Sequence, residues 1–283
     1  MATATGTQAS RPAPDGLYRY DGLAEGVTRF DSVTEREIAR FREQGYLVVH
    51  DAFTIDRVQD ALDGLLDLLA GSSPTFESVD YESSVDPATL DGMAAEERQD
   101  YVRKFMWFVG YDERLRALSE DPALMRVVRR IIGEEPMLFQ DMALLKPPRV
   151  GIEKPWHQDH AYFNLELRTR VVGVWIALDR ATTGNGCMLV KPGSHLQGPV
   201  VHFKRRDWQI CDADVDPLGT LAVPLEPGGC LFFSSLMQHG TAPNASDQRR
   251  RAVQFHYRPA GAELTSLEER MAVFGSEGKD VTC

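Results

Sequence analysis

The chain has 283 residues, of which 43% are hydrophobic and 26% are charged. This is the composition of an ordinary globular protein, so it excludes a collagen, a disulfide-rich scaffold and a wholly disordered chain. The 31 basic and 42 acidic side chains give a formal net charge of −11. Such a charge repels nucleic-acid phosphates and anionic membrane surfaces, so we expect no nucleic acid and no membrane as partners.

The cysteines and the N-terminus bear on the cellular compartment. Cys187, Cys211, Cys230 and Cys283 are few and irregularly spaced, which favours reduced thiols over a disulfide framework or a zinc site. The N-terminus lacks the charged start and apolar run of a signal peptide, and no apolar stretch reaches the roughly 18 residues that span a bilayer. We therefore expect a cytoplasmic protein.

The chain begins with a polar segment and then turns helical. Residues 1–16 mix small and polar residues without periodicity, which predicts a disordered tail. Ser32 or Thr34 can cap a helix that ends at Gly45. The apolar run 46–49 predicts a strand directly after it.

Further helices are predicted before the middle of the chain. The apolar positions of 55–69 recur at helical spacing and end before Gly71. The polar stretch 72–95 predicts a long surface loop. Helical patterns return at 95–108 and at 113–132, the second of them broken by a proline near its middle.

The second half of the chain consists of short β-rich segments separated by turns. These segments are 137–148, 161–167, 171–179, 186–195, 219–225, 229–240 and 250–258. Their regular spacing is typical of a sandwich or a barrel.

The chain contains no segment with the composition of a linker. We therefore predict one domain over 17–262, in which helices at 33–133 support a β core at 134–260. Residues 263–283 form a C-terminal extension.

Two histidines and one aspartate stand out as candidate metal ligands. His157 and Asp159 are two residues apart, so on an extended segment both side chains point to one face. His239 ends the β-like segment that precedes Gly240. Two imidazoles and one carboxylate form the facial set of non-haem Fe(II) oxygenases. A pair of this spacing also arises by chance, and single histidines are common in cores and on surfaces.

Three consecutive arginines follow this histidine. On a strand, Arg250 shares a face with Ala252 and Gln254, whereas Arg249 and Arg251 face the other way. A guanidinium held inside a barrel suits the bidentate binding of a carboxylate. We interpret Arg249 and Arg251 as a solvated basic cluster.

Several motifs in this order resemble the phytanoyl-CoA dioxygenase-like family of Fe(II)/2-oxoglutarate oxygenases. The resemblance covers roughly 33–260 and rests on WHQDHAYF, GVWIALDRATTGNGCMLVKPGSH and HGTAPN, with Arg250 eleven residues after His239. It implies a mainly β fold with flanking helices, whose core is a double-stranded β-helix (jelly roll, cupin-like) with N-terminal helical support. It also implies Fe(II) bound by His157, Asp159 and His239, and 2-oxoglutarate held by Arg250, with O2 as the oxidant.

The resemblance implies further contacts with the cosubstrate. Thr241 occupies the place of a hydroxyl that assists the arginine, and Trp175 and Met142 match residues of the same pocket. Trp175 also fits a plain core aromatic. Lys104 matches a cosubstrate-contacting lysine, although it precedes the β core and also fits a surface position.

A buried amide needs a polar partner. Gln140 shares a strand face with Leu138, Met142, Leu144 and Lys146, so we expect it to bind the cosubstrate or the substrate.

Two further groups of residues each allow two structural interpretations. His160, Tyr162, Phe163 and Asn164 fit either the mouth of a substrate site or a packed β edge. The basic stretch 203–208 fits an anionic substrate less well than it fits a solvated loop.

The resemblance implies hydroxylation of a small-molecule substrate, with release of succinate and CO2. Secondary metabolism is one setting for such an enzyme, and desaturation, epoxidation and cyclisation stay open. The alternative is a jelly-roll metal-binding protein without oxygenase turnover, and a β-sandwich interaction module leaves the ligand set unexplained. The sequence specifies neither the substrate, nor the oligomeric state, nor the role of the loops at 72–95 and 196–218.

Overall fold

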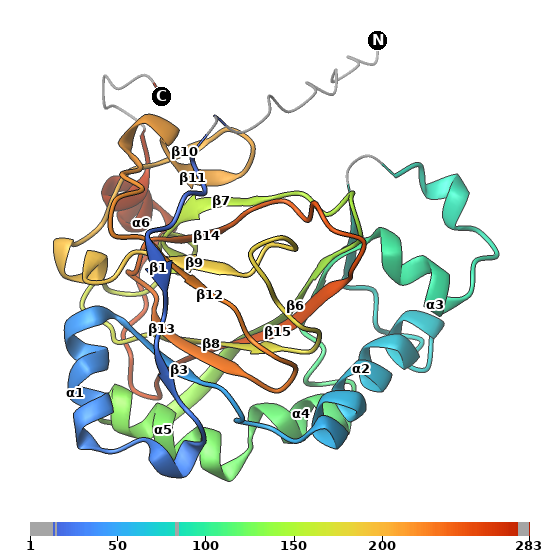
Figure 1. The fold of residues 1–283 in the computed structure, drawn as a ribbon, viewed down its shortest axis with the longest axis horizontal. Helices are drawn as coiled ribbons and strands as arrows, with labels where there is room; N and C mark the ends of the chain where they lie inside the picture. The colour runs from blue at the N-terminus through green and yellow to red at the C-terminus, as the bar shows by residue number, and fades with distance from the viewer. Residues whose placement is uncertain (1–13, 15, 83–84, 277–282) are drawn as a thin grey trace.

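The computed structural model describes residues 14, 16–82, 85–276 and 283. Most of the tail predicted at 1–16 therefore lies outside the described residues. The described chain forms two main β sheets and a separate two-stranded hairpin. Figure 1 shows most helices on one side of the sheets and α6 beside the hairpin. The prediction of a mainly β fold with flanking helices is confirmed.

The larger sheet has eight strands. Their order is β2 (Gly26–Val27), β3 (Tyr46–Val49), β13 (Cys230–Ser234), β8 (Val172–Ala177), β15 (Arg250–Pro259), β6 (Pro136–Lys146), β5 (Val102–Met106) and β4 (Val79–Tyr81). Except for the parallel pair β2 and β3, neighbouring strands are antiparallel.

The smaller sheet has five strands. Their order is β1 (Gly22–Leu23), β12 (Leu221–Val223), β9 (Met188–Val190), β14 (His239–Thr241) and β7 (Lys154–His157). A separate hairpin is formed by β10 (His202–Lys204) and β11 (Trp208–Ile210).

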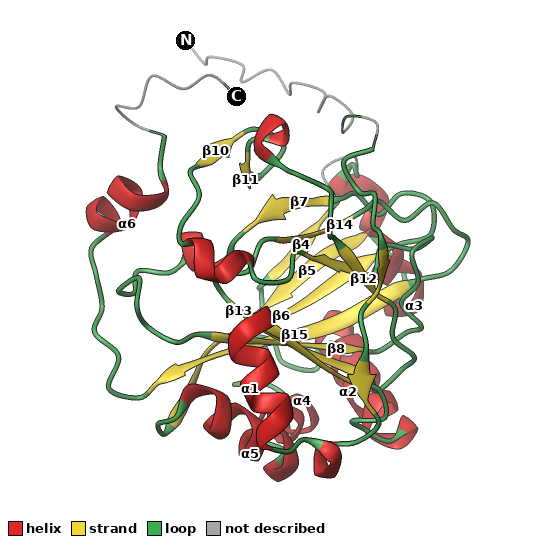
Figure 2. Cartoon of the chain, turned by 60° about the vertical axis from the view of Figure 1, so that its left-hand side comes forward, coloured by secondary structure: helices red, strands yellow, loops and turns green. Residues whose placement is uncertain are grey.

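Helices cover the outer face of the larger sheet (Figure 2). They are α1 (Glu35–Gln44), α2 (Ile55–Ala70), α4 (Glu113–Ser119) and α5 (Pro122–Ile132). The chain also contains α3 (Ala95–Arg98), α6 (Leu267–Phe274) and 3-10 helices at Phe30–Ser32, Pro87–Leu90, Gln99–Tyr101, Asp159–Tyr162, Ser194–Gln197 and Asp212–Asp214. Among the described residues, none of these helices is long and apolar enough to cross a bilayer.

The first two helices begin and end where the sequence predicts. Thr34 and Glu37 form a capping box at the start of α1, and Gly45 ends that helix in the left-handed conformation. Gly71, also left-handed, ends α2. These signals are local in sequence, which is why they were readable.

Alternation along the central strands produces two cores. On β8, Val174 and Ile176 pack with the helices, whereas Trp175 and Ala177 face the space between the sheets. The side chains predicted as metal and cosubstrate ligands lie in this second space. The helices therefore support the larger sheet from its other face.

Some sequence-based predictions were wrong. The helix predicted at 95–108 ends early, and 102–106 is strand β5 because it pairs with β6. The loop predicted at 72–95 contains strand β4. The strand predicted at 161–167 is absent from the described structure there, where a 3-10 helix and an irregular segment stand instead. The segment 229–240 forms two strands, so His239 begins β14 and does not end β13.

One strand changes phase midway. β6 and β15 pair with a register shift at His256 and Tyr257, so Gln140 lies opposite His256 while Leu138 lies opposite Tyr257. Leu138 consequently packs against the helix-side core, while Gln140 and Met142 line the internal cavity. The prediction that Leu138 shares their face was wrong because a bulge is invisible in a periodic pattern.

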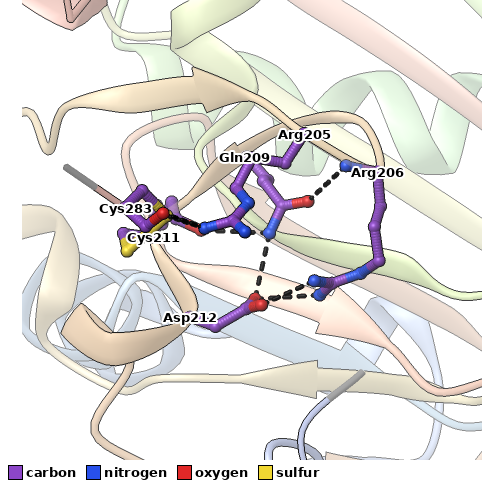
Figure 3. The surroundings of a disulfide bond; sticks show 7 residues. Arg205, Arg206, Gln209, Cys211, Asp212 and Cys283 are labelled. Carbon is purple, nitrogen blue, oxygen red and sulfur yellow. Dashed lines mark hydrogen bonds and ion pairs between the residues drawn. A yellow bond between two sulfur atoms is a disulfide. The ribbon is translucent and has the colours of Figure 1, made fainter. Parts of the chain in front are cut away.

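The cysteines differ from expectation. Cys211 and Cys283 form a disulfide (Figure 3). Cys187 and Cys230 are free and buried. The prediction that all four thiols are reduced was therefore wrong. The irregular spacing of the cysteines in the sequence does not prevent this bond, because the chain brings Cys283 back to the segment after β11.

Candidate metal centre and cosubstrate pocket

Three side chains predicted as metal ligands converge between the sheets. His157 ends β7 and His239 begins β14, and the two residues are directly paired across these strands. Asp159 opens the 3-10 helix that follows β7. The Oδ1 atom of Asp159 is 3.2 Å from Nε2 of His157 and 3.6 Å from Nε2 of His239. One ligand atom from each residue lies within 4.8 Å of the others.

The protonation states of these groups suit a metal. Burial would raise the pKa of Asp159, but His239, His256 and His157 lower it well below its ordinary value. Burial, together with the neighbouring His157, lowers the pKa of His239 to about 3. An ionised carboxylate and a neutral imidazole are the forms that bind a metal ion.

The same three residues line a cavity of about 330 Å³. All nine side chains predicted for the site lie in its wall: Lys104, Gln140, Met142, His157, Asp159, Trp175, His239, Thr241 and Arg250. The tertiary structure therefore brings the sequence candidates together. Their roles stay predictions.

Arg250 is a buried cation of this wall. Its side chain is buried, donates a hydrogen bond to the carbonyl of Leu144 at 2.9 Å and lies 5.6 Å from the ring centroid of Trp175. Burial lowers the pKa of Arg250 to about 10, so the guanidinium stays charged at neutral pH.

Three buried polar atoms around this arginine are unsatisfied. Nε of Arg250, Oγ1 of Thr241 and Nε1 of Trp175 find no hydrogen-bond partner among the described residues. Leaving buried donors unpaired is costly, so such a cluster indicates a ligand with acceptor atoms. A carboxylate of 2-oxoglutarate fits this donor set, and two imidazoles with one carboxylate fit Fe(II).

The flanking arginines confirm the predicted strand phase, whereas the predicted solvation is wrong for Arg251. Arg251 binds Asp179 through two nitrogens, and Arg249 binds Asp100. Only about a sixth of the Arg251 side chain is exposed, so it belongs to a partly buried ion pair rather than a solvated cluster.

Most of the remaining candidates lie in the cavity wall, and His160 does not. Lys104 lies on β5, where it forms a 3.0 Å ion pair with Asp80, so it belongs to the sheet instead of preceding it. The side chain of Gln140, on β6, is half-buried and lines the cavity, so a ligand there can reach its amide. Tyr162 and Phe163 line the cavity, as the mouth interpretation requires. His160 lies elsewhere, buried against Ser235.

Sequence reasoning missed several polar residues of the wall. Lys154 donates to Asp207 at 2.7 Å and to the hydroxyl of Tyr162 at 2.9 Å. Arg103 lies 3.8 Å from the same Asp207. Asp207 belongs to the stretch 203–208, which was interpreted as a solvated loop, and that interpretation was wrong for this residue because it lines the cavity.

Two more missed residues contact the candidate ligand Asp159. Its Oδ2 atom lies 2.7 Å from Nε2 of His256 and 3.2 Å from Nε2 of Gln254. The alternation of β15 placed Gln254 on the face of Arg250, but nothing in the sequence linked either residue to an aspartate almost a hundred positions away.

Comparisons with known structures support the fold. The carbocyclase SnoK from nogalamycin biosynthesis superimposes with a TM-score of 0.66 at 22% identity, covering 85% of this chain and 90% of that one. EvdO2 from Micromonospora carbonacea var. aurantiaca, in complex with 2-oxoglutarate, gives a TM-score of 0.64 at 26% identity, covering 86% and 97%. The predicted jelly-roll core is confirmed.

Comparisons of sequence point to the same family. The probable phytanoyl-CoA dioxygenase of Caenorhabditis elegans is 26% identical over 83% of this chain and 80% of its own length. A phytanoyl-CoA dioxygenase domain-containing protein of Danio rerio is 29% identical over 52% of this chain, and that match spans about half of the zebrafish protein, 53% of its length.

The family profile described as phytanoyl-CoA dioxygenase (PhyH) matches residues 41–252, which is well over half of the chain. The predicted enzyme class, a non-haem Fe(II)/2-oxoglutarate-dependent dioxygenase, is confirmed at the level of the family. The chain belongs to the phytanoyl-CoA dioxygenase family.

Proposed function

We propose that this protein oxidises a small-molecule substrate with Fe(II), 2-oxoglutarate and O2, and that hydroxylation is the reaction, with succinate and CO2 as coproducts. One observation carries the proposal. The unsatisfied donors around Arg250 open into the same cavity as His157, Asp159 and His239. A metal site and a carboxylate site in one enclosed space are what this reaction needs.

Different residues would bind the metal and the cosubstrate. His157, Asp159 and His239 would hold the iron, and Arg250 with Thr241 would hold the distal carboxylate of 2-oxoglutarate. Bound together with O2, iron and 2-oxoglutarate supply an oxidant strong enough to attack an unactivated C–H bond.

Burial of the site supports the same reaction. The ligand side chains and Arg250 are each less than a tenth exposed, so the wall excludes bulk water from the reacting atoms. Positioning and exclusion of water are the protein's contributions.

The rest of the wall favours a small substrate with polar groups. A cavity of about 330 Å³ must hold 2-oxoglutarate as well as the substrate. Lys154, Asp207 and Arg103 supply both donors and an acceptor next to the apolar rings of Tyr162 and Phe163. The expectations of a cytoplasmic location and of no nucleic-acid or membrane partner stay part of this proposal, although the Cys211–Cys283 disulfide removes reduced thiols as a ground for that location.

The alternative, a jelly-roll metal-binding protein without turnover, leaves the buried Arg250 without a purpose. A buried and unpaired guanidinium is costly to keep, and a metal site alone does not require it. The two functions differ in one measurable respect, the consumption of 2-oxoglutarate.

The experiment measures succinate formed from 2-oxoglutarate by purified protein with Fe(II), ascorbate and air, with and without a metabolite extract. We expect succinate that depends on Fe(II) and O2 and rises with the extract. Formation of no succinate under any of these conditions, by protein that binds Fe(II), would favour the alternative.

The matched variants are His157→Ala and His50→Ala. Losing one of three ligands should weaken metal binding by more than about 100-fold, because losing only a hydrogen-bond partner of a ligand costs about 10–100-fold. His50 is exposed and outside the cavity, so its variant should bind metal and form succinate like the parent. Calorimetric titration with Mn(II) gives the affinities.

A further inference from the structure

The two carboxylate oxygens of Asp159 have different surroundings. Oδ1 faces the two candidate ligand histidines, at 3.2 Å from His157 and 3.6 Å from His239. Oδ2 faces away from them, toward His256 at 2.7 Å and Gln254 at 3.2 Å. One oxygen is thus directed to the metal position and the other to the protein.

Both partners of Oδ2 come from one strand. His256 and Gln254 are two residues apart on β15, so they project from the same face, the face that also carries Arg250. The strand that supplies the cation of the cosubstrate pocket therefore also holds the carboxylate of the metal site.

The surroundings of His256 fix its ring. Its side chain is fully buried, with the rings of Phe163, Phe139 and Phe233 at centroid distances of 5.0, 6.2 and 6.3 Å. Its Nδ1 atom has no hydrogen-bond partner among the described residues. The contact with Asp159 is thus the polar interaction that holds this imidazole. The amide nitrogen of Gln254 lies 3.1 Å from the same Nε2.

The direction of the hydrogen bond follows from the acceptor. An ionised carboxylate can only accept, so Nε2 of His256 and the amide nitrogen of Gln254 both donate to Oδ2. Two donors on one oxygen stop the carboxylate from rotating and leave Oδ1 as the single free ligand atom.

We propose that His256 is a positioning residue that, with Gln254, holds Asp159 as a monodentate ligand of the iron. This inference rests on the proposed function, because it requires that Asp159 binds the metal. Hydrogen-bond partners of metal ligands commonly set metal affinity in this way. His256 itself does not contact the metal position, the cosubstrate pocket or the substrate wall.

The test separates the hydrogen bond from the packing of the ring. His256→Phe keeps an aromatic ring in the apolar cage but removes the donor. His256→Gln loses the ring but places an amide donor at a reach close to that of Nε2. Phe139→Leu disturbs the cage and leaves the hydrogen bond in place.

Metal affinity is measured by Mn(II) titration, and ligand geometry by the visible absorption spectrum of the Co(II)-loaded protein. We expect His256→Phe to weaken Mn(II) binding by about 10–100-fold and to change the Co(II) spectrum. His256→Gln should recover most of the affinity, and Phe139→Leu should stay within about threefold of the parent, given that it removes no hydrogen-bond partner of a ligand.

The outcomes distinguish this inference from the function it rests on. If the parent binds no metal, the proposed function fails. If the parent binds Mn(II) and folded His256→Phe binds it equally well with an unchanged Co(II) spectrum, only the positioning role is wrong. If His256→Gln binds Mn(II) as weakly as His256→Phe, the packing of the ring and not its donor supports the site, and the inference is again wrong.

If His256→Phe does not fold, a second variant tests the same inference. Gln254→Met removes the second donor to Oδ2 at nearly constant length. We expect a smaller loss of Mn(II) affinity than for the histidine, because the 3.2 Å contact is longer than the 2.7 Å one. Parent-like affinity and spectrum in this variant would contradict the role assigned to the pair.

Discussion

At the scale of single residues, the site is organised by what its buried charges pair with. Arg251 and Arg249 each have a carboxylate, whereas Arg250 between them has only a backbone carbonyl and an aromatic face. A charged group that has no carboxylate partner in a cavity indicates a binding site for an anion. The three arginines therefore provide a matched set of variants.

Arg250→Ala should weaken 2-oxoglutarate binding by about 2–5 kcal/mol, because the variant leaves a carboxylate without its buried partner. The measurement is calorimetric titration of the Mn(II)-loaded protein with 2-oxoglutarate. Arg249→Ala is the control, since that side chain is 40% exposed and its ion pair with Asp100 lies outside the cavity. A larger loss of affinity in Arg249→Ala than in Arg250→Ala would show that the pocket is assigned to the wrong cation.

His202 links the site to acid stability. Burial lowers the pKa of His202 to about 3. Its Nδ1 donates to the carbonyl of Val200, and its Nε2 accepts from the backbone N–H of Gln158, which stands between two candidate ligands. The ring must stay neutral to keep both hydrogen bonds.

The sign of the pH dependence follows from the two pKa values of His202. The unfolded chain takes up a proton near pH 6.5, before the folded protein does, so the free energy of unfolding falls as the pH drops from 6.5 toward 3. Protonation of this residue should lower the free energy of unfolding of the parent by about 2 kcal/mol between pH 7 and pH 5. Urea unfolding at both pH values measures it. His202→Gln does not titrate, so its decline should be smaller, and an equal decline in both proteins would contradict the assignment.

At the scale of elements, close packing between strand β8 and an aromatic ring supports the candidate metal site. Gly173 on β8 lies opposite His256, and a Cβ atom built on it would stand 2.4 Å from the ring of Phe233. That ring packs 4.8 Å from the ring of His239. The absence of a side chain at Gly173 thus leaves space for an aromatic ring that supports a candidate ligand.

Gly173→Ala should lower the free energy of unfolding by about 1–3 kcal/mol, because a rigid buried ring cannot move away from an added methyl group. We also expect weaker Mn(II) binding through the displaced Phe233. Gly110→Ala is the control, since nothing lies within 4 Å of a Cβ there, and it should change stability by less than about 0.5 kcal/mol. Thermal and urea unfolding report both effects, and equal stability of the two variants would refute the close contact.

At the scale of the whole molecule, a disulfide ties the end of the chain to the hairpin beside the site. Cys211 and Cys283 are 72 positions apart, and Arg205 donates to the carbonyl of Cys283 (Figure 3). The helix α6 lies between them in sequence, and Arg270 on it donates to the carbonyl of Tyr162 at 2.6 Å. The C-terminal part of the chain therefore contacts the segment that carries Asp159.

Cys283→Ser should lower the free energy of unfolding by about 2–4 kcal/mol, the usual contribution of a bond that closes a long loop. Thiol titration of unreduced, unfolded parent protein should find the two thiols of Cys187 and Cys230, and four after reduction. Four thiols before reduction would mean that the bond does not form in the isolated protein. Dithiothreitol should destabilise the parent and leave Cys283→Ser unchanged.

The sequence alone determined those features whose signals are local or periodic. Capping residues and terminal glycines marked α1 and α2, and alternation on β15 separated Arg250 from its two neighbours. The ligand candidates and Arg250 followed from spacing and strand alternation, and Gln140 followed from its strand face. The family resemblance implied the other four cosubstrate contacts, and the structure places all nine side chains in one wall.

Tertiary pairing decided the rest. Residues 102–106 form a strand because they pair with the edge of β6. A bulge in the pairing of β6 with β15 places Leu138 and Gln140 on opposite faces. The contacts of Asp159 with His256 and of Lys154 with Asp207 join positions far apart in sequence. Such contacts leave no local pattern, because hydrogen bonds and ion pairs depend on distance in space and not on separation along the chain.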